Sequence, residues 1–297
     1  MLFRILIKIK CFLLCINFVV GVFNPSLHDI FEAVDAWMDD PSSANTSYGN
    51  IKYWNVSGIT TMEELFSADR KPKSANFNDD ITGWDMSSVT STSRMFDGAE
   101  SFDQPIGVWN ISNVESFEAM FIRAGSFNQD LSNWNTGKVT TFFKMFRDAS
   151  SFDGSIDAWD TSSVEDMGHM FVGASEFNSP INSWDTSSVT SMEHMFLRAR
   201  NFNQPLSNWD VSSVESMLGM FLATPAFDQD LSAWCDKISD DCFECTKEVH
   251  HVGTKCNYVE SGHISEDLNF AGIVIVAAVF GLALVLAAWV MSGVQAP

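Results

Sequence analysis

Basic residues are scarce in this 297-residue chain, which has 17 Lys and Arg against 38 Asp and Glu and a formal net charge of -21 at pH 7. Such an acidic surface repels nucleic acid and anionic lipid, which excludes nucleic acid as a partner. The charge is explained either by the solubility of a secreted protein or by a preference for cationic partners. The central part of the chain also lacks a Ser/His/Asp order, a phosphate-binding glycine loop and a helical pair of zinc ligands. We therefore expect no enzyme and no cofactor, and a chain that acts by recognition or as a scaffold.

Tryptophan recurs at a fixed interval through the centre of the chain. Every step is 25 residues except the first, which is 30 because SADRKPKSANF carries five extra residues between Phe66 and Phe77. A fixed period of this size predicts a stack of repeats, each covering the apolar edge of the next. One bulky ring at the same place in every coil predicts an internal support. The tryptophans are Trp54, Trp84, Trp109, Trp134, Trp159, Trp184, Trp209 and Trp234.

Each repeat divides into two halves. The first contains apolar residues at the spacing of one helical stripe of about three turns. The second, FNQPLSNWD, is rich in turn residues, and its proline at 180 or 205 would break a helix, so it predicts a turn and a short strand. Together they predict an α/β, leucine-rich-repeat-like solenoid of strand-turn-helix coils over residues 51–234. In one repeat the stripe consists of Val189, Met192, Met195, Phe196 and Ala199.

A polar column of Asn or Asp lies six residues before each Trp. It predicts a structural ladder, in which short side chains satisfy turn amides in their own and the adjacent coil. A stacked calcium site is the alternative, although the GGxGxD pattern that would support it is absent. The column consists of Asn78, Asp103, Asn128, Asp153, Asn178, Asn203 and Asp228.

The repeated columns also carry a family resemblance. WDTSSVTSMEHMF, followed by A-x-x-FNQPLSNWD, resembles the repeat of the BspA-like leucine-rich-repeat surface proteins, first described as a domain of unknown function in mycoplasma lipoproteins. The resemblance covers residues 51–234. It implies a non-catalytic repeat protein of the cell surface and offers no catalytic motif to carry over.

The N-terminus predicts secretion. A basic segment, MLFRILIKIK, precedes the apolar CFLLCINFVVGVF, which together predict a signal peptide over residues 1–23, with an uncleaved anchor as the alternative. A lipoprotein signal is rejected because Cys15 follows Leu14 rather than a small residue.

Residues 24–50 predict a helical cap over the first coil. Ser26 and Asp29 resemble a capping pair, and DDPSSANTSYGN predicts a loop. The apolar stripe of the helix consists of Leu27, Ile30, Phe31, Val34, Trp37 and Met38.

Cysteines cluster where the repeat ends. Cys235, Cys242, Cys245 and Cys256 predict two disulfides in a cap and stalk over residues 235–269, with three connectivities open. A zinc site formed by Cys242 and Cys245 with a histidine at 250 or 251 is the competing interpretation.

An apolar segment over residues 270–291 is long enough to cross a bilayer, with a short tail at 292–297. The prediction is a single-pass protein of the cell surface with an extracellular N-terminal ectodomain. A GPI signal with Ser261 and Gly262 near the cleavage site remains the alternative. Three N-x-S/T acceptors for glycosylation lie in the first third of the mature chain, at Asn45, Asn55 and Asn110.

Two columns do not repeat, at the tenth and fourteenth residues after each Trp. Both fall off the apolar stripe and predict a solvated face that is basic within an acidic molecule, with an ordinary polar face as the alternative. His169 and His194 suggest a metal ion, but the sequence supplies no third ligand, so no metal site is predicted. The predicted binding residues are Arg94, Arg123, Lys144, Arg147, His169, His194 and Arg198.

The insertion DRKPK, residues 69–73, is the only dense basic cluster after the signal and predicts a projecting loop. Such a loop either carries function or is simply a tolerated insertion. The leading hypothesis for the whole chain is a membrane-anchored ectodomain that recognises or adheres to a protein or a surface glycan. The alternative is a structural component of the cell envelope with no discrete ligand.

Overall fold

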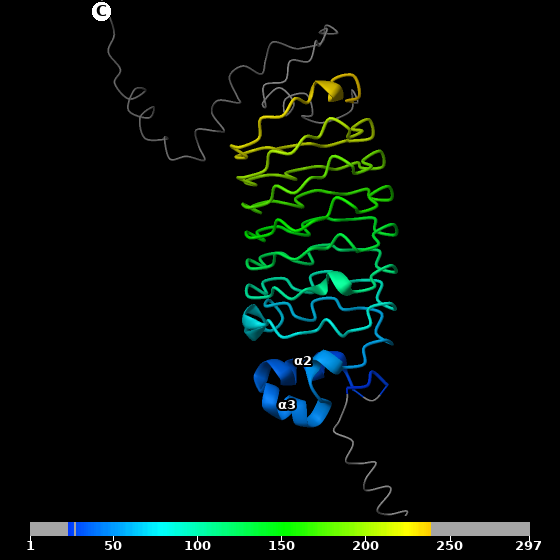
Figure 1. Cartoon of the computed structure of the whole chain (residues 1–297), viewed down its shortest axis with the longest axis vertical. Helices are drawn as coiled ribbons and strands as arrows, with labels where there is room; N and C mark the ends of the chain where they lie inside the picture. Colours follow the sequence, from blue (N-terminus) through cyan, green and yellow to red (C-terminus); the bar gives the residue numbers. More distant parts are fainter. Residues whose placement is uncertain (1–22, 27, 239–297) are drawn as a thin grey trace, which may run out of the picture. The chain divides into compact units, whose positions relative to one another are not determined.

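The computed structural model describes residues 23–26 and 28–238 (Figure 1). The N-terminal segment up to residue 22, which holds most of the predicted signal peptide, lies outside the described residues, as do the cysteines after Cys235 and the apolar segment at 270–291. The predictions for these segments stay predictions. Within the described part, none of the helices has the length and apolarity of a membrane-spanning segment. The helices are α2 (Ile30–Asp39), α3 (Pro41–Tyr48) and the short 3-10 helices η1 (Ile51–Tyr53), η2 (Pro72–Asn76), η3 (Ile106–Val108) and η4 (Ser232–Trp234).

Helix α2 confirms the predicted N-terminal helix. It begins where the Asp29 Oδ1 atom accepts hydrogen bonds from the backbone amides of Phe31 at 2.7 Å and Glu32 at 3.1 Å. This contact satisfies amides that a helix leaves without intrahelical partners at its N-terminus. The N-cap is Asp29 and not Ser26, whose backbone amide donates to Asn24 Oδ1 at 2.9 Å.

Helix α3 occupies the segment predicted to be a loop, so that prediction is wrong. The Asp40 carboxylate accepts from the amides of Ser42 at 3.0 Å and Ser43 at 3.3 Å. Pro41 stands at the first helical position, where its missing N–H is not needed. Local capping therefore outweighs the turn-forming composition of this segment.

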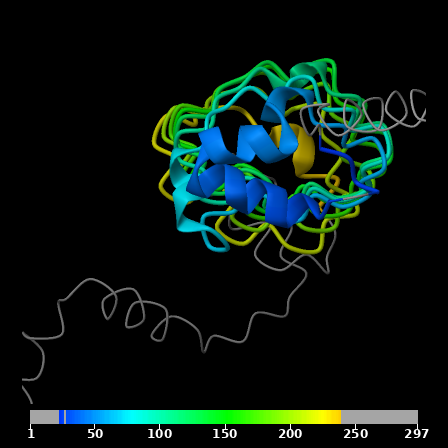
Figure 2. The same ribbon diagram turned by 90° about the horizontal axis from the view of Figure 1, so that it is seen from below.

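The two helices lie across the end of the first coil, as the view along the stack shows (Figure 2). Trp54 is only 2% exposed there. Phe23 stacks on its ring at 5.1 Å, and Trp37 meets it edge-on at 5.9 Å. Trp37 also donates from Nε1 to Asp79 Oδ2 at 2.7 Å. Helix α2 and the segment before it therefore pack against the first tryptophan of the array, and the assignment of residues 24–50 as a cap stays a prediction.

Successive repeats lie on one another as coils (Figure 1). At the seventh residue after each Trp, a single-residue parallel bridge joins each coil to the next, so equivalent residues lie side by side. Parallel pairing of this kind spaces the coils roughly 4.8 Å apart. The bridges run from Thr61 through Ser91, Ser116, Thr141, Asp166 and Ser191 to Ser216.

The apolar half of the repeat forms turns rather than the predicted helix, which corrects that part of the strand-turn-helix coil. Near the middle of the stack, the Ala119 amide donates to the Phe143 carbonyl of the next coil at 2.8 Å. The Met120 amide instead closes a tight turn with the Phe117 carbonyl at 3.1 Å. Ala119 and Arg123 both have a φ of +58°, which interrupts a right-handed helical path. Amides thus alternate between local turns and the neighbouring coil.

The Trp column lies inside the stack, as predicted. Trp159 is 4% exposed and stacks between Trp134 and Trp184, with ring centroids 6.2 Å away on both sides. Two columns of phenylalanine run beside the tryptophans. Phe146 packs on Phe152 of its own coil at 3.8 Å. Each coil therefore buries aromatic surface of its neighbours, and stability is shared along the array.

The Asn and Asp column forms the predicted ladder between adjacent coils. The Asn128 amide donates to Asp103 Oδ1 at 2.9 Å, and the Asp153 amide donates to Asn128 Oδ1 at the same distance. Gln129 Nε2 adds a second hydrogen bond to Asp103 Oδ1 at 2.7 Å. The ladder interpretation is confirmed, and these oxygens act as acceptors for the next coil.

Candidate functional site

The residues of the tenth-position column share a left-handed backbone. Every one of them, from Glu64 to Gly219, has a φ between 54° and 64°. This conformation costs an L-residue about 1–2 kcal/mol. Because it recurs in each coil and is held by hydrogen bonds between coils, it belongs to the framework rather than to one strained site. The column is not evenly solvated, since Ala119 is 3% exposed whereas the Arg94 side chain is 43% exposed.

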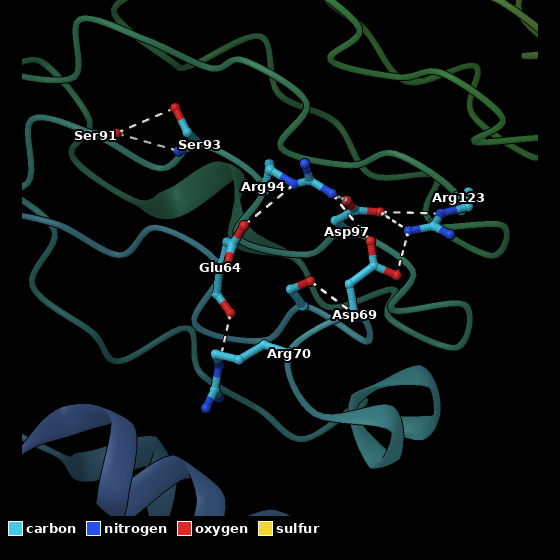
Figure 3. Close-up of polar contacts among 9 residues, drawn as sticks. Glu64, Asp69, Arg70, Ser91, Ser93, Arg94, Asp97 and Arg123 are labelled. Carbon is cyan, nitrogen blue, oxygen red and sulfur yellow. Dashed lines mark hydrogen bonds and ion pairs between the residues drawn. The ribbon is translucent and has the colours of Figure 1, made fainter.

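A buried carboxylate organises the first part of this face (Figure 3). The Asp97 side chain is 1% exposed and lies between two guanidinium groups. Arg94 Nη2 donates to Asp97 Oδ2 at 2.7 Å, and Arg123 Nη2 donates to Asp97 Oδ1 at 2.6 Å. Asp69 contacts both arginines, at 3.1 Å and 3.0 Å. The hydrogen bond to Asp97 is the main cause that raises the pKa of Arg123 above its ordinary value.

These contacts change the interpretation of the predicted basic face. Arg94 also lies 3.6 Å from Glu64, so two guanidinium groups face three carboxylates. The positive charge predicted at Arg94 and Arg123 is therefore compensated locally. Their first role is to keep Asp97 paired, since an isolated buried carboxylate would be costly.

The next coil, which begins at Trp134, adds two cations with fewer acidic neighbours. Lys144 Nζ lies 4.4 Å from the Phe143 ring centroid, a cation–π contact, and Arg147 Nε lies 3.4 Å from Asp148 Oδ2. Arg198 is exposed further along the stack. A pocket of about 310 Å³ opens where Lys144 and Arg147 face the two paired arginines. The residues that line it are Arg94, Asp97, Glu118, Ala119, Ile122, Arg123, Lys144, Arg147 and Asp148.

The two histidines are brought together by the stacking of coils. Their rings lie 4.9 Å apart with planes inclined by 28°. Burial lowers the pKa of His169, and the charge of His194 lowers it further, whereas Glu193 opposes both effects. Glu193 is the neighbour that the sequence did not reveal. The His169 amide donates to the Glu193 carbonyl at 2.7 Å, so the offset between coils, rather than sequence spacing, sets them side by side.

The DRKPK insertion folds back on α2 instead of projecting, which corrects the predicted loop. Arg70 Nη1 pairs with Asp35 Oδ1 at 2.6 Å. Lys71 and Lys73 contact the Asp39 carboxylate at 2.9 Å and 3.0 Å and lower its pKa, with Lys71 the larger cause. The insertion therefore fastens the helical cap to the first coil.

The three candidate glycosylation residues are all exposed. Asn45 lies on α3, while Asn55 and Asn110 lie directly after tryptophans. Asn55 Oδ1 accepts from the Ser57 amide at 3.2 Å, and Asn110 Oδ1 accepts from the Ser112 amide at 3.2 Å. These bonds use Oδ1 and not Nδ2, the atom that would carry a sugar.

Among the cysteines predicted to form disulfides, only Cys235 falls within the described residues, where it ends η4 as the C-cap. Cys242, Cys245 and Cys256 lie beyond residue 238. Their pairing remains a prediction.

Stacked coils with buried aromatic columns define a repeat protein. Residues 37–156 and 144–255 match the family described as Mycoplasma protein of unknown function, DUF285. The two matches overlap and together span well over half of the chain, so the chain belongs to this family. Neither a curated protein nor a solved structure matches the sequence of this chain.

Proposed function

We propose that this chain is a membrane-anchored, extracellular repeat protein of the BspA-like type, which recognises acidic groups of a protein or surface glycan. The observation that carries the proposal is the pocket of about 310 Å³ where Lys144 and Arg147 join the anchored arginines. Arg94 and Arg123 keep 43% and 47% of their side chains exposed despite pairing with Asp97. A planar guanidinium held in place suits carboxylate or sulfate oxygens.

The proposal includes the solenoid class, a signal peptide and a C-terminal anchor. The 25-residue period and the parallel bridges support the solenoid class. The basic N-terminal segment and the apolar segment at 270–291 support secretion and anchoring. The proposal includes no enzymatic activity.

A structural role in the cell envelope is the competing function. Growth of a filament by end-to-end stacking would require open coil edges at both ends. Helices α2 and α3 cover the first coil, with Trp54 buried beneath Phe23 and Trp37. This cover disfavours end-to-end assembly and supports recognition through the side of the stack.

Binding of the full chain to immobilised sulfated and carboxylated polysaccharides, at two salt concentrations, tests the proposal. Replacing Lys144 and Arg147 by Gln should weaken binding at low salt and flatten its salt dependence, because exposed charges act through screened long-range attraction. The matched control replaces Lys138 and Lys237 by Gln and removes the same charge elsewhere. Equal binding by wild type and the test variant contradicts the proposal, as does an equal loss in the control.

A further inference from the structure

We propose that His169, Glu193 and His194 form a binding site for a divalent transition-metal ion, with zinc as the best fit. One imidazole nitrogen from each histidine and one carboxylate oxygen of Glu193 all lie within 4.8 Å of one another. Two imidazoles and a carboxylate are an established ligand set for zinc, and they leave a fourth position for water or a partner group.

The backbone holds these three residues in place before any ion binds. The His169 amide donates to the Glu193 carbonyl at 2.7 Å, and the His194 amide donates to the Leu218 carbonyl at 2.8 Å. Both histidines keep the left-handed conformation of their column, with φ of 60° and 54°. Binding an ion therefore requires only side-chain rotation. Donor atoms around a tetrahedral zinc ion lie roughly 3.3 Å apart, so the required movement is short.

The cluster includes a buried nitrogen that has no hydrogen-bond partner among the described residues. His194 Nδ1 is buried and makes no hydrogen bond within the described part of the chain. It lies 3.2 Å from Glu193 Oε1, but the two atoms are not aligned for a hydrogen bond. Buried polar nitrogens normally have a hydrogen-bond partner, because a buried nitrogen without one loses the hydrogen bonds that it makes to water. A metal ion between Nδ1 and the carboxylate would satisfy both atoms.

The coil that follows leaves room for the His194 ring. Gly219 occupies the equivalent position, and a Cβ atom there would lie 2.6 Å from His194 Cδ2 and 2.8 Å from Nε2. Any side chain at 219 would therefore displace the ring, in addition to the cost of its φ of 64°. The absence of a side chain at this one position keeps the pair of imidazoles stacked and in reach of Glu193.

The surroundings favour a transition metal over calcium or magnesium. Lys144 and Arg147 lie close enough to influence His169, and their charge opposes a bound cation. An ion held mainly by charge would be repelled, whereas zinc, copper and nickel gain from direct bonds to neutral imidazole.

The test is the protection of individual histidines in the full chain from diethylpyrocarbonate, with Zn²⁺ alone as the probe and peptide mass spectrometry as the readout. A residue-level readout is needed because Cys242, Cys245, His250 and His251 can also bind zinc. We expect Zn²⁺ to protect His169 and His194 while Ca²⁺ and Mg²⁺ do not. His28 serves as the internal control, because its Nδ1 accepts from the Asn24 amide and no such cluster forms around it among the described residues.

Glu193→Gln should raise the zinc concentration needed for protection at least about tenfold. Loss of a group that only orients a metal ligand already lowers metal affinity by about this factor, and Glu193 is proposed to bind the ion directly. Glu118→Gln is the matched control, because Glu118 occupies the same column three coils earlier. Unchanged thermal unfolding without metal would show that both variants fold. Absence of zinc protection in wild type, protection by Ca²⁺ as well, or an equal effect of the two substitutions would overturn the proposal.

Discussion

The indole Nε1–H of Trp159 donates a hydrogen bond of 2.9 Å to the backbone carbonyl of Leu131, 28 residues earlier in the chain and one coil away. The same bond joins Trp134 to Ile106 and Trp184 to Ile156, at 3.2 Å and 3.0 Å. Each tryptophan thus fills the interior of its coil and closes a polar contact with the coil before it. Buried indoles need such a partner for their N–H group. The column therefore sets both the packing and the register of the stack.

Trp159→Ala should lower the free energy of unfolding by about 3–5 kcal/mol, because it removes a fully packed aromatic ring from the centre of the array. Trp159→Phe keeps an aromatic ring but loses the hydrogen bond to the Leu131 carbonyl. The difference in the free energy of unfolding between the two variants therefore separates the effect of packing from that of hydrogen bonding. Denaturant unfolding of the full chain measures both. Unchanged stability in Trp159→Ala would contradict the internal role of the column.

Asp97→Asn should cost about 1–3 kcal/mol, because the side chain is buried and pairs with two guanidinium groups. Asp69→Asn is the comparison, since Asp69 contacts the same arginines but its side chain is 53% exposed. An exposed pair is worth about 1 kcal/mol or less. Urea unfolding of the two variants at the same pH should rank Asp97→Asn as clearly less stable; the reverse order would refute the assigned role of Asp97.

Arg70→Ala should loosen the helical cap. Besides pairing with Asp35, Arg70 Nη2 donates to the Leu65 carbonyl at 2.6 Å, which links α2 to the first coil. Hydrogen bonds of charged groups contribute about 1.5–3 kcal/mol. Amide exchange in α2 should therefore accelerate while exchange in the central coils stays unchanged. Lys73→Ala, which removes a largely exposed contact with Asp39, should have little effect on either region.

Acid should remove the contribution of the pair formed by Asp80 and Lys52. Lys52 and then Thr82 lower the pKa of Asp80 from 3.8 to about 2 in the folded chain. The carboxylate therefore stabilises the fold above pH 3.8, and this contribution is lost as pH falls from 3.8 towards 2. Because the two side chains are 38% and 40% exposed, solvent screening keeps this contribution to the free energy of unfolding small at pH 7.

The measurement is the stability of Asp80→Asn relative to wild type across this range of pH. The difference should be present at pH 7 and vanish near pH 2. Asp157→Asn, which removes another exposed carboxylate, serves as the control. A difference that stays constant down to pH 2 would show that Asp80 does not act through its charge.

The period, the buried tryptophans and the Asn/Asp ladder could be predicted from the sequence because each depends on one column. A bulky ring recurring every 25 residues has to meet its own copy in the next coil, whatever path the chain takes between them. The cap helix was also predictable, since Asp29 and the apolar stripe that follows are local signals.

The conformation of the apolar half was not predictable by the same reasoning. Residues three and four apart lie on one side of an α-helix, but consecutive tight turns bury the same positions. The deciding residues, such as Ala119 and Arg123, are neither Gly nor Asn and give no local sign of a positive φ. Only the hydrogen bonds offered by the neighbouring coils favour the turns.

The long-range contacts of the site were missed for a related reason. Glu193 reaches His169 through an offset of one residue between coils, and Arg70 reaches Asp35 because the insertion folds back. A sequence read as a set of columns compares only equivalent positions. Contacts between different columns depend on register and side-chain direction, which require the structure.

A disulfide across two coils tests the central claim, which is that equivalent residues of successive repeats lie side by side. Ser116 and Thr141 form one of the parallel bridges, whereas Ser116 and Asp166 are two coils apart. With coils roughly 4.8 Å apart, the first pair meets the Cα separation of about 4.4–6.8 Å that a disulfide needs, and the second pair, at roughly 10 Å, does not. Paired cysteines at 116 and 141 should therefore cross-link on mild oxidation of the full chain, as peptide mapping would show, while cysteines at 116 and 166 stay unlinked. Failure of the first pair to cross-link, or equal cross-linking of the second, would contradict the stacked register on which the recognition face and the proposed metal site both depend.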